Sequence, residues 1–273
     1  MRELLRHPTG LVGATLLAIV LVAVLFGPML APYDPQQFHP AVRLRGPSAA
    51  HWLGTDQFGR DILSRILHGA RATILFGVGA TLAGVAAGTL IGVTAGVAGR
   101  WIDSAIMRLL DGLLAVPDLL FTLLIVTVLG GGTGHAMLAV AVAFAPGMAR
   151  ISRAAVLSVR TREFVQAAQA RGESPFYVIG AEVLPNTMGP VIVEATIRVS
   201  FAIMLGATLG FLGLGAQPPS TEWGLMIAEA RQFMFRNPWC VAVPGVAIAV
   251  AALGFNLFGD ALRDILDPRG RQR

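Results

Sequence analysis

Long apolar stretches alternate with short charged segments along this chain. A bilayer core requires about 20 apolar residues in a helix, and most of the stretches reach that length. The pattern predicts an all-α, polytopic membrane protein that forms a single membrane domain over residues 1–273, without a separate soluble domain. Its six predicted transmembrane helices cover approximately residues 9–30, 72–99, 105–129, 135–149, 190–214 and 238–259.

Two of these spans carry further local signals. Small residues recur every four positions in the second span, at Gly84, Gly88, Gly92 and Gly96. Such a row makes one helix face smooth, so that another helix can approach closely; lining a pore is the alternative role. In the third span, Pro117 predicts a kink near the membrane interface.

The distribution of arginines predicts the orientation. Because positive residues favour the cytoplasmic side, we expect cytoplasmic N- and C-termini, outer loops at 31–71 and 215–237, and a long cytoplasmic segment at 150–186. The bias is incomplete, since the loop 31–71 alone carries several arginines. In the second outer loop, Met226, Ile227 and Ala230 predict the buried face of a short helix.

The first outer loop contains an amphipathic segment. Thr55 is a capping residue, and apolar residues at helical spacing follow it, whereas Arg60 and Arg65 fall largely elsewhere. The spacing predicts a helix that lies on the outer membrane surface or docks across other spans. Its apolar face comprises Phe58, Ile62, Leu63, Ile66 and Leu67.

Composition narrows the function. The chain is 55% hydrophobic and 14% charged, whereas soluble domains carry about 25% charged residues. All 21 basic residues are arginine, and a phosphate-binding P-loop requires a lysine, so an ATPase that drives this protein must be a separate polypeptide. The net charge of +5 lies in loops between apolar spans, which indicates membrane topology and no nucleic-acid partner.

The sequence offers little for metal or nucleophile chemistry. The single cysteine, Cys240, excludes an internal disulfide, and the five histidines form no ligand pair such as His-Glu-x-x-His. We therefore predict no catalytic residue, no metal site and no cofactor bound by this chain. The alternative of an intramembrane enzyme would need a Ser–His or metal pair at mid-membrane depth. A passive channel would have no use for the hairpin described next.

The charged segment 150–186 predicts a helical hairpin. A first helix over 159–171 is expected to end at Gly172, which can take a left-handed conformation. One face of this helix comprises Phe164, Ala167, Ala168 and Arg171, and the small alanines would let a partner surface approach the backbone.

The second arm of the hairpin begins at Ser174, a capping residue, with Pro175 at the first helical position. It is expected to run to residue 183. Leu184-Pro185 is expected to stop this helix before the chain re-enters the membrane.

The hairpin resembles the "EAA" loop of ABC importer permeases. The resemblance rests on Gln166-Ala167-Ala168, Gly172 and Leu184-Pro185, although the family consensus has Glu where this chain has Gln166. Further segments resemble the dipeptide/oligopeptide/nickel permeases, specifically the "C" member of each permease pair; they are 51–71, 211–219, 222–224 and 255–268. The resemblance covers nearly the whole chain and implies a type I ABC importer permease architecture.

The resemblance also implies roles and partners. In that family the loop docks into a groove on the ATP-binding subunit, which assigns ATPase coupling to Glu163, Gln166, Ala167, Ala168, Gly172, Leu184 and Pro185. The implied complex, in the lipid of a bacterial inner membrane, contains a sister permease in a heterodimer, two ATP-binding subunits that carry ATP and Mg, and an extracytoplasmic substrate-binding protein. The expected cargo is a short peptide, with nickel, glutathione or another small polar solute as alternatives.

The fifth span holds the candidates for the translocation path. Glu194 and Arg198 lie four residues apart, and charges inside a membrane usually face protein or water. They are expected to form a mutual ion pair, with lining of the path as the alternative. Met204 is a further candidate, and Gly206 would widen the path because it has no side chain.

Overall fold

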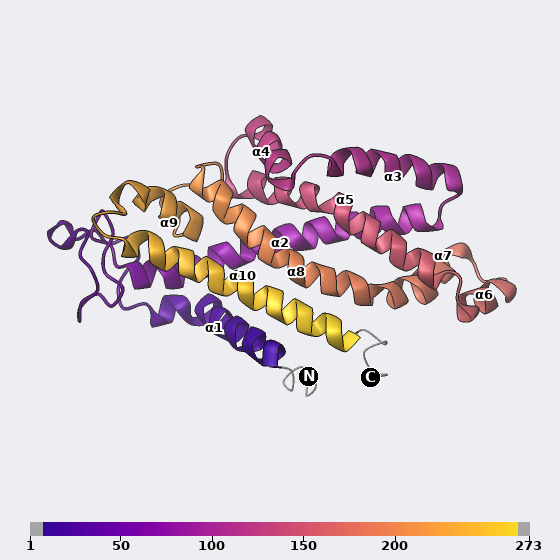
Figure 1. The fold of residues 1–273 in the computed structure, drawn as a ribbon, viewed down its shortest axis with the longest axis horizontal. Coiled ribbons are helices and arrows are strands. Elements are labelled where there is room, and N and C mark those ends of the chain that lie inside the picture. Colours follow the sequence, from indigo (N-terminus) through magenta and orange to yellow (C-terminus); the bar gives the residue numbers. More distant parts are fainter. Residues whose placement is uncertain (1–7, 267–273) are drawn as a thin grey trace.

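The computed structural model describes residues 8–266, which are helical almost throughout and form an elongated bundle (Figure 1). Within that range, extended structure is limited to an isolated bridge between Thr55 and Asp61. Five long helices run along the bundle, namely α1 (Pro8–Leu30), α2 (Ile62–Val97), α5 (Thr133–Val159), α8 (Leu184–Phe211) and α10 (Trp239–Leu266).

The bundle has two different ends, which we name by their contents (Figure 1). The loop end carries residues 31–61 and the short helices η2 (Pro40–Val42), α9 (Trp223–Ala230) and η4 (Arg231–Phe233). The hairpin end carries α6 (Glu163–Ala170) and α7 (Pro175–Tyr177). Helix α1 begins and α10 ends toward the hairpin end, so both described ends of the chain lie on the same side. The termini themselves, at 1–7 and 267–273, lie outside the described residues, and their cytoplasmic location stays a prediction.

Five helices in the described range are long and apolar enough to cross a membrane, and a bent pair makes a sixth if it counts as one span. The pair consists of α3 (Arg100–Leu114) and α4 (Asp118–Leu129), which meet at 89°. The predicted third span is therefore not a single kinked helix. Pro117 is the N-cap of α4, and because it has no N–H to continue the preceding helix, the chain turns sharply there.

The glycine row of α2 packs against α5. A Cβ atom added at Gly88 would lie 2.5 Å from the carbonyl oxygen of Ala145, and one at Gly84 would lie 2.9 Å from that of Ala141. These distances leave no room for any side chain, so the two backbones approach closely. The packing role predicted for the row is confirmed, and the pore-lining alternative is not needed.

The start of α2 differs from the sequence prediction. No separate helix begins at Thr55; Asp61 is the N-cap, and its side chain accepts a hydrogen bond of 2.8 Å from the N–H of Ser64. The helix then continues without a break through residue 71 into the membrane-length part of α2. Arg65 is buried on this first part, so the segment is packed inside the protein and does not lie on a membrane surface.

The fourth long helix is also longer than predicted. We expected a span that ends at Arg150, but α5 continues to Val159. Arg150 forms an ion pair with Asp111, and Arg153 one with Asp103, both on α3. Because carboxylates on the neighbouring helix neutralise these arginines, the charges do not end the helix.

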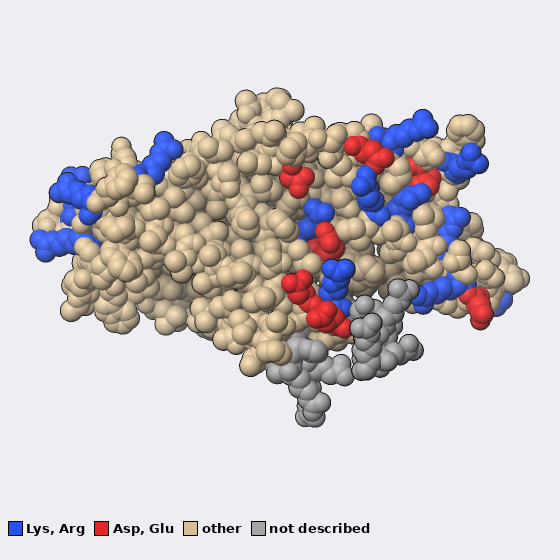
Figure 2. Space-filling model, in the orientation of Figure 1, with Lys and Arg blue, Asp and Glu red and all other residues tan. Residues whose placement is uncertain are grey.

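Charged residues are distributed unevenly along the bundle. In the face that Figure 2 shows, the loop end carries arginines and no acidic residue, whereas the hairpin half carries both signs. A belt without charged side chains separates the two regions. This is the pattern expected of a protein whose middle is surrounded by hydrocarbon.

Candidate functional site

The first arm of the hairpin is anchored by small apolar residues. Val165 and Ala168 are buried on α6 and pack in one cluster with Val156, Val159 and Val178. The arm begins at Glu163 and not at residue 159, because α5 ends there and Arg162 forms the N-cap of α6. The hairpin is therefore seated on the end of α5.

The bend of the hairpin follows the prediction at Gly172. Its φ angle is +80°, its N–H donates to the carbonyl of Gln169 at 3.0 Å, and the N–H of Glu173 donates to that of Ala168 at 3.3 Å. This pair of bonds is a Schellman motif, which closes a helix over a left-handed residue. A left-handed residue is strained with most side chains, so glycine fits here.

The predicted coupling residues differ in their exposure to solvent. Ala168 is fully buried against its own chain, which corrects the expectation that both alanines are open to a partner; only Ala167 is exposed. Leu184 is half-buried. The remaining members are exposed, and they are Glu163, Gln166, Ala167, Gly172 and Pro185.

The second arm begins as predicted but does not stop as predicted. Ser174 caps it by accepting a hydrogen bond from the N–H of Tyr177 at 3.3 Å, with Pro175 at the first position. A π-turn (Val178–Val183) follows, and helix α8 continues directly from it, so helical structure is unbroken from Pro175 to Phe211. The wider π-turn accommodates Pro185, which lacks the N–H that a regular helix would use.

The tip of the hairpin carries an exposed aromatic residue that the sequence reasoning missed. Phe176 on α7 is 89% exposed. A cavity of about 540 Å³ separates the hairpin from the turn between α2 and α3, lined by Val97, Gly99, Arg160 and Val178 among others. The hairpin is thus held at its base and open on this side.

The predicted ion pair lies on α8. Arg198 Nε is 3.0 Å from Glu194 Oε1, and the guanidinium lies 5.1 Å from the centre of the Phe144 ring. Both side chains are only partly exposed, and the guanidinium is packed between α8 and α5. The ion pair is confirmed, and a place in the translocation path stays a prediction.

The two other path candidates, Met204 and Gly206, lie in different surroundings. Met204 is half-exposed on α8, as a path residue requires. Gly206 is buried, and the ring of Phe76 from α2 fills the space in which its side chain would lie. The expectation that Gly206 widens a path is therefore wrong, since the missing side chain makes room for Phe76.

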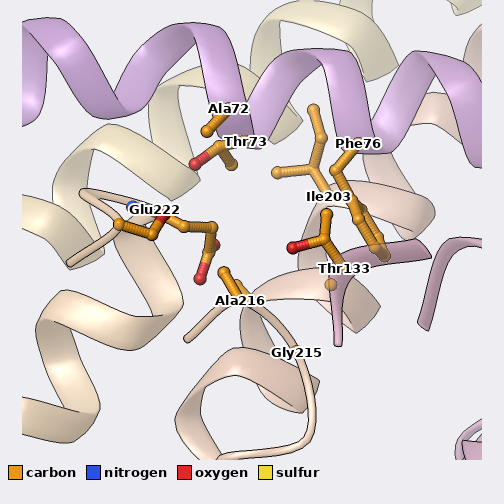
Figure 3. Close-up of a pocket in the computed structure, with 11 residues that line it drawn as sticks. Ala72, Thr73, Phe76, Thr133, Ile203, Gly215, Ala216 and Glu222 are labelled. Carbon is orange, nitrogen blue, oxygen red and sulfur yellow. Dashed lines mark hydrogen bonds between the residues drawn. The ribbon is translucent and has the colours of Figure 1, made fainter. Parts of the chain in front are cut away.

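A small cavity of about 40 Å³ lies next to this contact, between α2, α8 and the loop before α9 (Figure 3). Glu222 lies at its edge and caps α9, accepting hydrogen bonds from the N–H groups of Gly224 at 2.9 Å and Leu225 at 2.8 Å. Burial raises the pKa of this carboxyl, against the two backbone donors that lower it. Helix α9 itself matches the predicted short helix, with Met226 and Ala230 buried.

A buried charge cluster at the loop end is a second feature that sequence reasoning missed. Asp56 Oδ2 lies 2.6 Å from both Arg60 Nε and Arg65 Nη1. Glu229 Oε2 lies 2.8 Å from Arg60 Nη2 and 3.1 Å from Arg65 Nη2. The cluster ties the first loop to α2 and α9. Three of its members, Asp56, Arg60 and Arg65, are close together in sequence, but the fourth, Glu229, is too distant to be recognised as their partner.

These features define the class of the protein. The described residues contain no group of three or more His, Cys, Asp or Glu that could hold a metal ion. What they do contain is a set of membrane-length helices and a hairpin joined to one of them without a break. This arrangement is typical of an integral membrane subunit that receives movement from a partner.

Comparison with known families identifies the group. The family described as "Binding-protein-dependent transport system inner membrane component" matches residues 88–272. The "N-terminal TM domain of oligopeptide transport permease C" matches residues 1–47. The chain therefore belongs to the family of binding-protein-dependent transport system inner membrane components, which are multi-pass permease subunits of ABC transporters and not enzymes.

Named relatives cover almost the whole chain. The dipeptide transport system permease protein DppC of Alkalihalophilus pseudofirmus is 42% identical over 268 residues, which are 98% of this chain and 88% of that protein. DppC of Escherichia coli (strain K12) is 43% identical over a region that covers 98% of this chain and 91% of that protein. The glutathione transport system permease protein GsiD of Salmonella paratyphi A is 41% identical, with coverage of 97% and 87%.

Solved structures show the same fold. An inward-facing structure of the MetNI methionine ABC transporter matches with a TM-score of 0.62 and 17% identity, covering 74% of this chain and 96% of that one. At this identity the likeness concerns the arrangement of helices alone.

Proposed function

We propose that this chain imports short peptides as one of two permeases in an ATP-driven complex with two ATPase subunits and an extracytoplasmic binding protein. ATP and Mg belong to the ATPase subunits in this proposal. The hairpin end faces the cytoplasm and the loop end faces the binding protein. The exposed hairpin residues Glu163, Gln166, Ala167 and Gly172 contact an ATPase subunit.

The observation that carries this proposal is the unbroken helix from the hairpin into the membrane. Helical structure continues from Pro175 to Phe211, and the ion pair of Glu194 and Arg198 lies on the same helix. A force applied at the hairpin tip therefore acts on α8 through a stiff element rather than through a loop. Such an element converts movement of a partner into movement of the groups that would line the path.

The peptide cargo is supported by the names of relatives. Three relatives at 42–43% identity are named for dipeptides or D,D-dipeptides, and one at 41% is named for glutathione, which is itself a small peptide. Short peptides are therefore the proposed class, with glutathione as the second candidate.

The test is transport by the reconstituted complex. The chain is co-expressed with the sister permease, the ATPase subunits and the binding protein encoded beside it, and uptake is measured in proteoliposomes with ATP inside or outside. Binding-protein-dependent uptake of labelled dipeptides, driven by ATP on the hairpin side, is the expected result. Preferential uptake of glutathione would favour the second candidate, and uptake without ATP would contradict the proposal.

A further inference from the structure

The loop end segregates its charges by sign. Its acidic residues are mostly withdrawn from solvent: Asp56, Asp61 and Glu222 are buried, and Glu229 is bound to two arginines. Asp34 is the exposed exception. The exposed arginines of this end, which we call the arginine surface, are Arg43, Arg45, Arg71, Arg231 and Arg236.

No carboxylate among the described residues lies within ion-pair distance of any member of the arginine surface, although 4.0 Å is allowed for such a pair. At the hairpin end, Arg150, Arg153 and Arg171 each have an acidic neighbour, whereas the exposed Arg100, Arg108 and Arg162 form no ion pair among the described residues. The positive charge of the loop end is thus not neutralised within the described part of the chain, as the blue residues of Figure 2 show for one face.

Two side chains of the arginine surface are held by hydrogen bonds to backbone carbonyls of their own loop. Arg43 Nε donates to the carbonyl of Gln57 at 2.6 Å, and Arg45 Nη2 donates to that of Ala41 at 3.2 Å. Asn237 Nδ2 donates to the carbonyl of Arg45 at 3.0 Å, which joins the first loop to the segment that carries Arg236. The buried cluster of Asp56, Arg60, Arg65 and Glu229 fixes the same loop to α2 and α9. A preorganised surface loses less conformational entropy on binding.

The retention of these arginines needs a reason. Arginine in a loop that must cross the membrane during insertion opposes the preferred orientation. Arg60 and Arg65 are neutralised within the buried cluster, but no member of the arginine surface has an acidic partner within residues 8–266. Two large apolar side chains are exposed in the same two segments, Trp52 at 72% and Phe235 at 94%. Arginine and aromatic residues together are typical of the energetic centres of protein–protein interfaces.

We propose that the arginine surface docks an acidic face of the extracytoplasmic binding protein, with Trp52 and Phe235 as apolar contacts beside it. This inference rests on the proposed function, because it takes the binding protein as the partner. A protein partner fits better than lipid headgroups, because the arginines are spread over separate segments that the structure locks into one platform. Complementary charge accelerates the encounter and fixes the orientation of the bound protein.

The test measures the affinity of the binding protein for the assembled permease–ATPase complex in nanodiscs of phosphatidylcholine. The test variant is Arg45→Gln/Arg236→Gln. The matched control is Arg100→Gln/Arg108→Gln, which removes the same charge from two exposed arginines of α3. We expect Kd to rise about tenfold or more in the test variant, with a weaker dependence on salt, because charge steering of this kind changes association by about 10 to 10³-fold. The control should keep the wild-type Kd.

Further measurements test whether the charge of the arginine surface causes the change in Kd. Arg45→Lys/Arg236→Lys keeps the charge and should retain most of the affinity, whereas a loss equal to that of the glutamine variant would overturn the proposal. Unchanged Kd in Arg45→Gln/Arg236→Gln would overturn it as well. So would an effect on Kd that appears only when the nanodiscs also contain phosphatidylglycerol, because the surface would then meet lipid. If the binding protein does not stimulate the ATPase of the wild-type complex, the proposed function fails. If it does stimulate the wild-type ATPase but the glutamine variant keeps the wild-type Kd, only the inference about the arginine surface fails.

Discussion

The N–H of Leu184 donates to the carbonyl of Ile179, five residues earlier in the chain. This bond belongs to the π-turn between the hairpin and α8. A π-turn contains one residue more than a regular helical turn, so it sets the rotation of the hairpin relative to the membrane part of the same helix.

Deletion of Gly180 should therefore uncouple ATP hydrolysis from transport. Removal of one residue converts the π-turn to a regular turn and rotates the hairpin by about 100° relative to α8. We expect the complex to assemble and hydrolyse ATP while uptake in proteoliposomes falls by at least about tenfold, as 1.4 kcal/mol of lost coupling would produce. Gly180→Ala is the control, since a Cβ there meets nothing within 4 Å. Full uptake in the deletion variant would show that the rotation is unimportant.

A side chain at Gly172 should damage the hairpin tip without preventing membrane insertion. The φ angle of +80° costs about 1–2 kcal/mol for an ordinary residue, and the bulk of Gly172→Arg would project from the exposed bend. We expect loss of transport and weaker co-purification of the ATPase subunits, with normal amounts of the permease in the membrane. Gly172→Asn separates the effect of backbone strain from that of side-chain bulk, because asparagine tolerates the left-handed conformation. Substrate-stimulated ATP turnover at the wild-type rate in Gly172→Arg would contradict the coupling role.

The glycine row should be sensitive to size. Gly88→Val places side-chain atoms where the backbone of Ala145 already lies, and overpacking of this kind costs about 1–3 kcal/mol or more. We expect a lower Tm in detergent and less monodisperse protein. Gly245→Val on α10 makes the same chemical change where no atom lies within 4 Å, so it should behave like the wild type. Equal losses in both variants would mean that helix propensity, not packing, is responsible.

The buried cluster should behave as one unit. Glu229→Gln leaves Arg60 and Arg65 with a single carboxylate, that of Asp56, and breaking a buried ion pair costs roughly 3 kcal/mol. We expect a clearly lower Tm for Glu229→Gln. Adding Asp56→Asn to Glu229→Gln should lower the Tm by less than Asp56→Asn lowers it in the wild type. Asp34→Asn, at an exposed carboxyl, is the control. Additive effects in the double variant would show that the two carboxylates act independently.

Local features of the hairpin were predictable from sequence because their causes are local. Gly172 and Ser174 act through the backbone of their own neighbours, so the end of the first helix and the start of the second could be placed from residue type alone. The orientation of Ala168 was not predictable in the same way. It is buried because α6 packs on α5, and no pattern within the short α6 indicates which face does so.

Two of the differences in the membrane part arise from compensation by residues far away in sequence. Arg150 was taken as the end of a span because its partner Asp111 lies on a different helix. Arg65 was placed on a polar face because Glu229, which neutralises it, is distant in the chain. Hydropathy thus located six apolar segments, of which five belong to single membrane-length helices and one to the bent pair of α3 and α4.

The carboxyl of Glu222 should make the stability of the loop end depend on pH. Burial raises its pKa in the folded protein above the value of 4.5 for an exposed glutamate. Between 4.5 and the raised value the unfolded chain is ionised while the folded protein still binds the proton. Because the folded state then holds more protons, its stability falls as the pH rises through that window. Glu222→Gln cannot ionise, so the difference in Tm between this variant and the wild type should shift in favour of the variant as the pH rises across the window. A difference in Tm that is constant with pH would show that the backbone donors of Gly224 and Leu225 fully offset the burial.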